Sequence, residues 1–393
     1  MSGIVFKNHT LKKRIIRLLD KKGTATINEI SKKLNSSVPK INSLIQELIY
    51  DELIEDLGTA ETGVGRRPHL YSLKSDSIYF LGVDIEYNSI NIGLVDFKEN
   101  LVVLEKNISF NLNNTEESLN DLCEIINSFI KKNSYWRKKI VSIGVNLSGR
   151  INHTTGYSHN FFNFHEQPLS EVIKSKTNIT TFIENDTQAK AFYEFKSKKT
   201  NNNNNILYIY VDYGLGLGVL ADGKLQYGKS GYSGGFGHIP FFDNEIICRC
   251  GKKGCLETEV SGRALVKQFK EKLSLGSASS LQNKFKNNKN LNMTDIIDAA
   301  NEGDTLSIEL IGILASKLGK GISALIHLYN PELIIFGGTL TETGDYFFLP
   351  VQIAVNKYTL SILRSDTQLQ LATISKGAGV IGACLLVKDR ILK

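Results

Sequence analysis

The 393-residue chain is poor in proline and lacks long hydrophobic runs. It has 6 prolines and 33 glycines, with 41% hydrophobic and 22% charged residues, a composition that excludes a disordered chain and a collagen-like repeat. The longest strongly apolar stretches, such as Ile206–Val211, are far shorter than the roughly 18 residues of a membrane-spanning helix. Residues 1–7 lack the apolar core of a signal peptide. We therefore expect a cytoplasmic protein of two to three domains without membrane contact.

Cysteine is also scarce, and its number is odd. The chain has 5 cysteines, of which Cys248, Cys250 and Cys255 fall within eight residues. An odd number clustered in this way suits a metal site in a reducing compartment better than a disulfide framework. Cys123 and Cys384 lie in apolar helical patterns, and we expect both in the core.

The excess of positive charge is small and unevenly distributed. The chain has 47 basic and 40 acidic residues, a net charge of +7. Residues 1–80 contain 13 Lys and Arg against 9 Asp and Glu, so +4 of this charge belongs to the first fifth of the chain. This distribution indicates an N-terminal part that binds a polyanion.

Three helices are expected in this N-terminal part. Apolar residues recur at helical spacing before Gly23, again over residues 27–34, and a third time after a polar turn at 35–37. Two helices joined by a tight polar turn are typical of a helix-turn-helix, whose second helix enters the major groove of DNA. The residues of the three apolar stripes are Leu11, Ile15, Leu18, Leu19, Ile27, Ile30, Leu34, Ile41, Leu44, Ile45, Leu48 and Ile49.

The opposite face of the third helix carries short or flexible polar side chains that can donate to phosphates and base edges. Strand-like runs at 53–55 and 69–73 then flank a glycine-rich segment in which Arg66 and Arg67 can reach a phosphate or the minor groove. We interpret residues 1–76 as a DNA-binding winged helix-turn-helix. The alternative is a helical dimerisation or protein-binding module with a solvated basic loop. The polar face consists of Ser36, Ser37, Lys40, Asn42, Ser43 and Gln46.

The remaining residues alternate strands and helices. Strand-like runs at 78–85, 90–95, 101–104 and 140–145 accompany one amphipathic helix; further runs at 206–211, 217–221 and 332–336 accompany a second, longer helix. We expect two α/β lobes with a cleft between them, and exposed connections without chemistry at 201–205 and 274–292. The inward-facing residues of the two helices are Leu119, Leu122, Ile126, Phe129, Leu306, Leu310, Leu314 and Leu318.

Several motifs resemble the ROK family of repressors and sugar kinases, over nearly the whole chain. The segments 234–238 and 248–257 resemble its signature, and Asn185-Asp186, 214–218 and 330–338 stand in family order. A winged helix before such a body is the layout of the family's xylose-repressor-like and N-acetylglucosamine-repressor-like members. The resemblance implies an actin-like, ribonuclease-H-like α/β fold with a sugar in the cleft, the first lobe over 77–190 with 372–393 and the second over 191–371.

The spacing His-x9-Cys-x-Cys-x4-Cys predicts a zinc site. His238, Cys248, Cys250 and Cys255 provide one imidazole and three thiolates. Four such ligands complete a tetrahedral shell with no position open for water, so the expected zinc is structural. Two glycines between the cysteines allow the tight turns that the site needs. The alternative is a set of reduced surface thiols.

Sugar recognition is expected from polar side chains of both lobes, because each pyranose hydroxyl is costly to bury unpaired. Zinc on one ring nitrogen of His238 leaves the other to donate to a hydroxyl, and Glu257 can accept from hydroxyls. Asn185 and Asp186 supply a donor-acceptor pair, and the resemblance adds Asn160. The alternative is that these polar residues have ordinary loop and capping roles.

One position departs from the family pattern. Three residues before His238, where the family usually has glutamate, this chain has Gly235. The missing carboxylate would grip the hydroxyls near the anomeric carbon. We expect either a ligand with a bulkier substituent or a phosphate in the vacated space, or weak sugar binding.

Both phosphate loops of the family's kinases are altered. In place of an Asp-x-Gly-Gly-Thr segment, whose glycines let the backbone approach ATP phosphates, the chain has Glu86 and Tyr87. Glu86 adds negative charge beside a triphosphate, and Tyr87 fills space. Asp212–Gly214 replaces the expected Gly-Thr-Gly. Asp186 is left as a vestigial base with no phosphoryl donor to serve, so we expect no catalytic activity.

Together these features predict a sugar-responsive transcriptional repressor with a catalytically silent kinase-like body. Its expected partners are double-stranded operator DNA and a sugar or sugar phosphate. A homodimer or dimer of dimers is expected because palindromic operators mirror a two-fold protein. The alternatives are an active ATP-dependent sugar kinase with a regulatory DNA-binding domain, and a DNA-binding protein whose body only dimerises.

Overall fold

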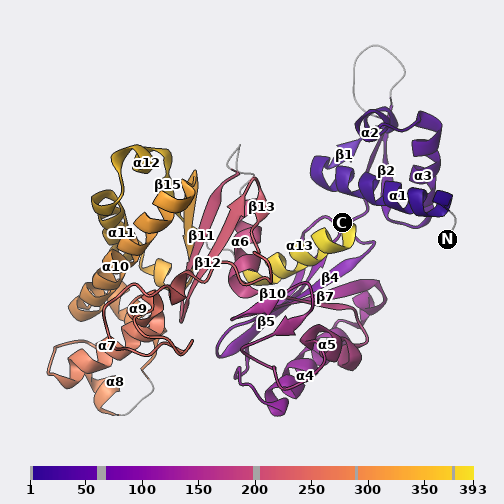
Figure 1. The fold of residues 1–393 in the computed structure, drawn as a ribbon. Coiled ribbons are helices and arrows are strands. Elements are labelled where there is room, and N and C mark those ends of the chain that lie inside the picture. The colour runs from indigo at the N-terminus through magenta and orange to yellow at the C-terminus, as the bar shows by residue number, and fades with distance from the viewer. Residues whose placement is uncertain (1–2, 60–67, 198–203, 288–290, 374–376) are drawn as a thin grey trace. The chain divides into compact units, whose positions relative to one another are not determined.

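The computed structural model describes residues 3–59, 68–197, 204–287, 291–373 and 377–393 (Figure 1). Contacts divide the chain into two compact units. Unit 1 consists of Met1–Ala189 with Gly377–Lys393, and unit 2 consists of Lys190–Lys376. The C-terminal residues therefore return to the unit in which the chain begins.

The N-terminal part of unit 1 folds as a winged helix. Thr26 accepts from the backbone N–H of Glu29, whose carboxylate accepts from Thr26 in return, so a capping box starts the second helix. That helix ends at Asn35 in the left-handed conformation, φ 49°, which makes the tight turn. The elements are α1 (Gly3–Lys22), β1 (Thr24–Ala25), α2 (Ile27–Leu34), α3 (Val38–Tyr50), β2 (Ile54–Thr59) and β3 (His69–Leu73), and the sheet order is β1-β3-β2.

The three apolar stripes expected from the sequence form the core of this part. Leu18, Ile27 and Ile49 are partly buried, and the remaining stripe residues are buried. The same cluster continues into Phe80 and Val387, so the winged helix packs on the rest of unit 1. Strand β2 is longer than the expected run 53–55, and the tip of the expected wing lies outside the described residues.

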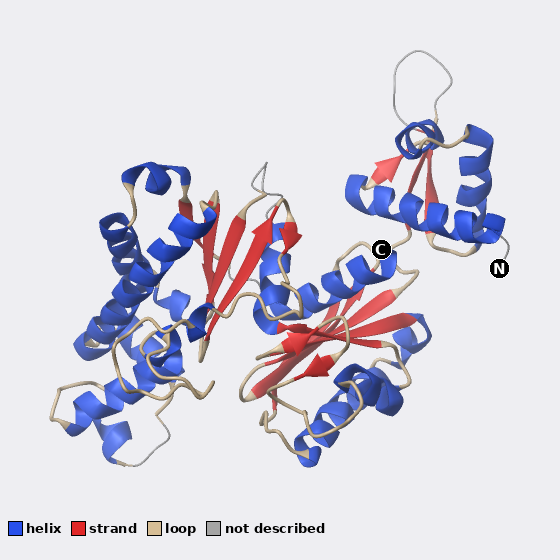
Figure 2. Ribbon diagram, in the orientation of Figure 1, coloured by secondary structure: helices blue, strands red, loops and turns tan. Residues whose placement is uncertain are grey.

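The rest of unit 1 is a five-stranded sheet covered by helices (Figure 2). Its order is β10-β7-β4-β5-β6, with β10, β7 and β4 parallel and β5 antiparallel to both of its neighbours. The elements are β4 (Tyr79–Ile85), β5 (Ser89–Asp96), β6 (Leu101–Ser109), α4 (Glu116–Lys132), η1 (Ser134–Lys139), β7 (Ile140–Leu147), β8 (Ile151–Asn152), β9 (Tyr157–Ser158), α5 (Leu169–Thr177), β10 (Thr181–Asn185), α6 (Asp186–Ser197), which runs on into unit 2, and α13 (Ala378–Leu392).

Helix α13 packs on this sheet at very short range. A Cβ at Gly82 would collide with the carbonyl of Val380, and one at Gly144 would lie 2.8 Å from the carbonyl of Ala383. Glycine at these two strand positions therefore admits the helix backbone. Cys384 of α13 and Cys123 of α4 are both buried, as expected.

Unit 2 repeats the sheet pattern with its own strands. The order is β13-β12-β11-β14-β15, with β11, β14 and β15 parallel and β12 antiparallel. The elements are β11 (Ile206–Val211), β12 (Leu215–Ala221), β13 (Lys224–Leu225), η2 (Phe236–His238), η3 (Leu256–Thr258), α7 (Gly262–Ser274), α8 (Gln282–Lys286), α9 (Met293–Asn301), α10 (Thr305–Tyr329), β14 (Leu333–Gly337), η4 (Thr339–Thr343), α11 (Asp345–Tyr358), α12 (Ser361–Asp366) and β15 (Gln368–Leu371).

Helix α10 corrects the expectation that no segment could span a membrane by its length. Among the described residues, this 25-residue helix with a hydropathy of 1.3 is the one that is long and apolar enough. Its apolar window is 61% buried inside the protein, and Leu306, Leu310, Leu314 and Leu318 all face the core. A core helix meets the same criteria, and packing in unit 2 accounts for the apolar character of α10.

Two expected connections are more ordered than the sequence suggested. The polar stretch 274–292 contains α8, and Leu281 and Phe285 pack against the core of unit 2. In the asparagine run, Asn204 and Asn205 donate their backbone N–H groups to the carboxylate of Glu332; residues 201–203 lie outside the described residues.

Candidate functional site

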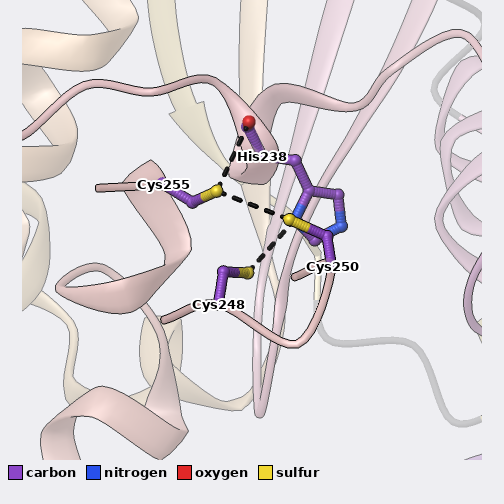
Figure 3. Close-up of side chains that lie close together, drawn as sticks. All are labelled: His238, Cys248, Cys250 and Cys255. Atoms are coloured by element: carbon purple, nitrogen blue, oxygen red, sulfur yellow. Dashed lines mark hydrogen bonds between the residues drawn. The ribbon is translucent and has the colours of Figure 1, made fainter. Parts of the chain in front are cut away.

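Residues 246–255 of unit 2 form a small hairpin, called the metal hairpin below. Its three cysteines lie beside His238 of η2, so the four expected metal ligands come together (Figure 3). The backbone N–H of Cys248 donates to Lys252 at 2.7 Å, and that of Gly251 donates to Cys248 at 2.9 Å. Gly251 and Gly254 have φ of 84° and 67°, values that side chains rarely tolerate. The two left-handed glycines therefore fold the three cysteines back toward His238.

The ligand atoms lie close enough together to surround one metal ion. All four lie within 4.8 Å of one another. Cys250 Sγ is 3.6 Å from Cys255 Sγ, and His238 Nδ1 is 3.5 Å from Cys248 Sγ. Around a zinc ion with Zn–S bonds of about 2.3 Å, neighbouring ligand atoms lie about 3.5–3.8 Å apart. The cluster can therefore hold a metal ion without a large rearrangement.

Two of the three thiols of this hairpin, those of Cys248 and Cys255, are not pre-ionised, whereas the pKa of Cys250 is lowered from its ordinary value. Burial raises the pKa of Cys255 to about 12, helped by its hydrogen bond with Cys250. Burial also raises the pKa of Cys248. These two thiols keep their protons at neutral pH, so a metal ion must displace the protons to bind thiolates.

Glu257 lies beside the metal hairpin, two residues after Cys255. The turns η2 and η3 adjoin, since the N–H of Leu256 donates to the carbonyl of Ile239 at 2.9 Å. A Cβ on Gly237 would lie 3.3 Å from Glu257 Oε2, so this carboxylate borders the turn that carries His238. The side chain of Glu257 is 10% exposed.

The carboxylate of Glu257 already has two donors. Arg263 Nη2 donates to Oε1 at 2.5 Å, and the backbone N–H of Leu215 donates to Oε2 at 3.3 Å. Sequence reasoning missed Arg263, because no local pattern marks an arginine six residues after a glutamate as its partner.

The remaining expected sugar contacts lie on unit 1, around one turn. Asn185, at the end of β10, donates through Nδ2 to the carbonyl of Gly149 at 3.1 Å. Asn160 accepts through Oδ1 from the N–H of Arg150 at 2.9 Å. The turn 149–150 therefore holds both amides. Asp186 follows Asn185 in the first turn of α6 and accepts from the N–H of Thr187 at 2.8 Å.

The carboxylate of Asp212 accepts hydrogen bonds within the loop after β11 and from the segment after β14. Asp212 Oδ2 accepts from the backbone N–H and the hydroxyl of Thr339, at 3.0 and 2.5 Å, and Oδ1 accepts from the N–H of Tyr213 at 2.7 Å. Burial and the negative charges of Asp212 and Asp298 raise the pKa of Glu342. Donors at the ends of β11 and β14 are thus occupied by a resident carboxylate.

The turn between β4 and β5 is likewise acidic. Glu86 accepts from the hydroxyl of Ser89 at 3.0 Å and from the amide of Asn91 at 3.1 Å. Tyr87, which follows it, is 42% exposed. The carboxylate and the ring stand at the tip of this hairpin.

On the winged helix, α3 presents the expected polar face to solvent. Lys40, Asn42 and Ser37 are exposed, whereas Ser36 is half-buried and accepts through its carbonyl from Ser31. Ser43 and Gln46 are also exposed. Arg66 and Arg67 lie outside the described residues.

Comparisons with known proteins match the N-terminal winged helix and the rest of the chain to two separate families. A profile of the ROK family matches residues 80–390, and a profile described as winged helix-turn-helix DNA-binding matches residues 9–55. The xylose repressor of Caldicellulosiruptor bescii is 28% identical over 393 residues and covers 98% of both chains. A glucokinase of Thermotoga maritima is 25% identical over 316 residues, covering 79% of this chain and 98% of its own.

A solved structure confirms the expected fold class. The crystal structure of a ROK family transcriptional regulator, a homologue of the Escherichia coli Mlc protein, has a TM-score of 0.81 to this chain at 25% identity. The likeness covers 98% of this chain and 97% of that chain. An actin-like α/β body preceded by a winged helix is therefore the fold.

Proposed function

The chain belongs to the ROK family, and we propose that within it the protein is a sugar-responsive transcriptional repressor. The observation that carries this proposal is the winged helix, whose α3 exposes Lys40 and Asn42 ahead of a complete ROK body. Residues 1–76 bind operator DNA, and residues 77–190 with 372–393 and residues 191–371 form the two sugar-binding parts.

DNA contacts come from Lys40 and Asn42 on α3 and from Ser36 and Ser37 in the turn before it, together with Arg66 and Arg67. Exposed polar side chains on a helix of this kind read base edges, and basic side chains neutralise phosphates. The protein acts in the cytoplasm as a homodimer or dimer of dimers, because two winged helices then match the two halves of a palindromic operator.

The effector is a sugar or sugar phosphate held by Asn160, Asn185, Asp186, His238 and Glu257. These side chains supply amide donors, amide acceptors and carboxylate acceptors, the mixture that pyranose hydroxyls require. The convergence of two amides on one turn and the closeness of Glu257 to the His238 turn support this assignment. The protein then has one state that binds the operator and one that does not. The effector changes the operator affinity only if it binds these two states with different affinities.

A structural zinc ion is held by His238, Cys248, Cys250 and Cys255. Three sulfur atoms and one imidazole nitrogen within 4.8 Å of one another suit zinc better than harder cations. A bound zinc ion would keep the three cysteines as thiolates. His238, whose Nδ1 lies 3.5 Å from Cys248 Sγ, would then ligate through Nδ1 and carry its proton on Nε2, which could donate to a hydroxyl.

The body is catalytically silent. Asp212 occupies the donors at the ends of β11 and β14 with its own carboxylate, and Glu86 adds a second negative charge in the other altered loop. Both repel a triphosphate, so Asp186 has no phosphoryl group to transfer. The competing candidate is an active sugar kinase with a regulatory DNA-binding domain, favoured by the likeness to a glucokinase.

The experiment uses the full chain. Selection from random duplexes is expected to enrich a two-fold symmetric site, and one member of a panel of xylose, glucose, N-acetylglucosamine and their phosphates is expected to raise the melting temperature and release that DNA. Failure of every sugar to change either property would contradict the proposal. Turnover of ATP with any panel sugar at about 1 per second, in the ordinary enzyme range, would support the kinase instead.

A further inference from the structure

We propose that Arg263 is a positioning residue for sugar recognition, which holds the carboxylate of Glu257 in the orientation that accepts sugar hydroxyls. The inference rests on the proposed sugar binding. Arg263 acts through Glu257, which contacts the sugar, and does not contact the sugar itself. Its basis is one set of contacts within unit 2, from Glu257 through Arg263 to Tyr213.

The contact between Arg263 and Glu257 fixes the carboxylate at one oxygen. Arg263 Nη2 donates to Oε1 at 2.5 Å, while the N–H of Leu215 donates to Oε2 at 3.3 Å. An ionised carboxylate has about four acceptor positions, so two donors leave about two for hydroxyls. One donor on each oxygen prevents the carboxylate from rotating about its last bond.

Arg263 is itself held by an aromatic ring. Its guanidinium carbon lies 5.9 Å from the centroid of Tyr213, and its backbone N–H donates to the carbonyl of Tyr213 at 3.3 Å. The neighbouring Gly262 N–H donates to the carbonyl of Asp212 at 2.8 Å. The loop after β11 is thereby tied to the start of α7, and Tyr213 stays over the guanidinium.

The same ring also contacts the metal hairpin. Arg249, between two of the cysteines, has its guanidinium carbon 5.5 Å from the centroid of Tyr213. Tyr213 therefore lies against two arginines, one that pairs with Glu257 and one that belongs to the hairpin. In this proposal the altered loop Asp212–Gly214 supports, through Tyr213 and Arg263, the carboxylate that binds the effector.

The test compares Arg263→Met and Arg263→Lys with a matched control, Lys317→Met. Lys317 pairs with Glu259 at 2.5 Å, and its side chain is 34% exposed, close to the 29% of Arg263. Both substitutions remove one half-buried cation from a carboxylate in the same segment, so a general loss of stability affects both variants.

Titration calorimetry with the best sugar of the panel provides the readout. Arg263→Met is expected to weaken binding at least tenfold and the control less than threefold. Arg263→Lys is expected to recover part of the affinity, because lysine keeps the charge but loses the stacked planar fork. Deoxy analogues of that sugar provide a second comparison. For the analogue that lacks the hydroxyl bound by Glu257, the affinities of wild type and Arg263→Met should differ less than they do for the complete sugar. Unchanged or tighter binding by Arg263→Met overturns the proposal.

Crystal structures of the sugar-free variants decide the matter independently of affinity. In Arg263→Met the carboxylate of Glu257 is expected to leave the N–H of Leu215, and in the control to keep its place. A Glu257 carboxylate that stays in place in Arg263→Met also overturns the positioning role. A wild-type chain that binds no sugar of the panel refutes the proposed function, whereas these structures still test what holds Glu257.

Discussion

At the scale of single residues, His153 couples the stability of unit 1 to pH. Burial, followed by the positive charges of Arg390 and Lys393, lowers the pKa of His153 to about 4. The unfolded chain, with a histidine pKa near 6.5, therefore binds more protons between pH 6.5 and 4. Folding stability is fully present above pH 6.5 and is lost as the pH falls through this window.

We expect His153→Gln to reduce the acid sensitivity of the protein. Between pH 7.5 and 5 the wild type should lose about 1–2 kcal/mol more unfolding free energy than the variant, after discounting the shift for partial solvent screening. Denaturant titrations at the two pH values measure the difference. His159→Gln, at an exposed histidine of the same segment, should behave as wild type; equal pH dependence of all three proteins would contradict the prediction.

Gly235 is a second residue with a measurable role. Its φ of −68° does not require glycine, and a Cβ there meets nothing within 4 Å. The N–H of His238 donates to its carbonyl at 3.0 Å, so a longer side chain would start beside the histidine turn.

We expect Gly235→Glu to improve the binding of plain glucose or xylose and to impair the natural effector. Each charge-assisted hydrogen bond to a hydroxyl is worth about 1.5–3 kcal/mol, and the new side chain takes space that the effector uses. Calorimetry against both ligands tests this, with Gly235→Gln as an uncharged control of the same size. Equal affinities in all three proteins would show that position 235 does not touch the sugar.

At the scale of elements, α3 is expected to make two kinds of DNA contact. Lys40→Ala is expected to weaken all duplexes alike and to reduce the salt slope by about 1, as for one lost phosphate contact. Asn42→Ala is expected to cost about 1–3 kcal/mol on the selected site and little on random DNA. Binding isotherms at several salt concentrations measure both effects. Lys138→Ala, at an exposed charge on η1, is the control. A loss of DNA affinity as large as that of Lys40→Ala would contradict the assignment of the DNA-binding surface to α3.

The metal hairpin is the second element with a specific outcome. Elemental analysis of protein purified without chelators is expected to find one zinc per chain, absent in Cys255→Ser. Loss of the metal should lower the melting temperature and abolish the response to sugar, because His238 is no longer held. Cys123→Ala changes a buried cysteine of α4 outside the hairpin and should keep its zinc. Wild-type protein without stoichiometric metal would refute the site.

At the scale of the whole molecule, Lys388 joins three distant parts of unit 1. Its side chain, 3% exposed on α13, pairs with Asp20 of α1 and with Glu99, 3.0 Å away in the turn before β6. Nζ also donates to the carbonyl of Phe97 at 2.8 Å. The winged helix is thus bonded to the helix by which the chain returns from unit 2.

We expect Lys388→Met to destabilise unit 1 by about 2–3 kcal/mol. Removing one partner of a buried ion pair typically costs about 3–5 kcal/mol, reduced here because Asp20 and Glu99 are 18% and 30% exposed. Lys393→Met breaks an exposed pair with Asp389 and should cost well under 1 kcal/mol. Denaturant unfolding compares the two variants, and equal losses would mean that the buried network adds nothing.

Elements and site residues that are encoded locally could be predicted from the sequence. The apolar stripes of α1, α2 and α3, the capping signal at Thr26 and Glu29, and the spacing of the cysteines all act over a few residues. Periodicity and spacing of this kind determine helices, turns and ligand clusters before any distant contact forms. The winged helix and the four clustered ligands follow from them.

The remaining features depended on where the chain returns in space. Thr339 meets Asp212 across 127 positions, and Lys388 meets Asp20 across 368. Arg263 is close in sequence to Glu257, yet its role depends on Tyr213 from another element. Such pairs leave no periodic trace, because an ion pair or a ring contact forms only after packing has set two backbones side by side. Local periodicity and spacing thus predicted the elements of the winged helix and the cluster of candidate metal ligands, whereas the ion pairs around them formed only through packing.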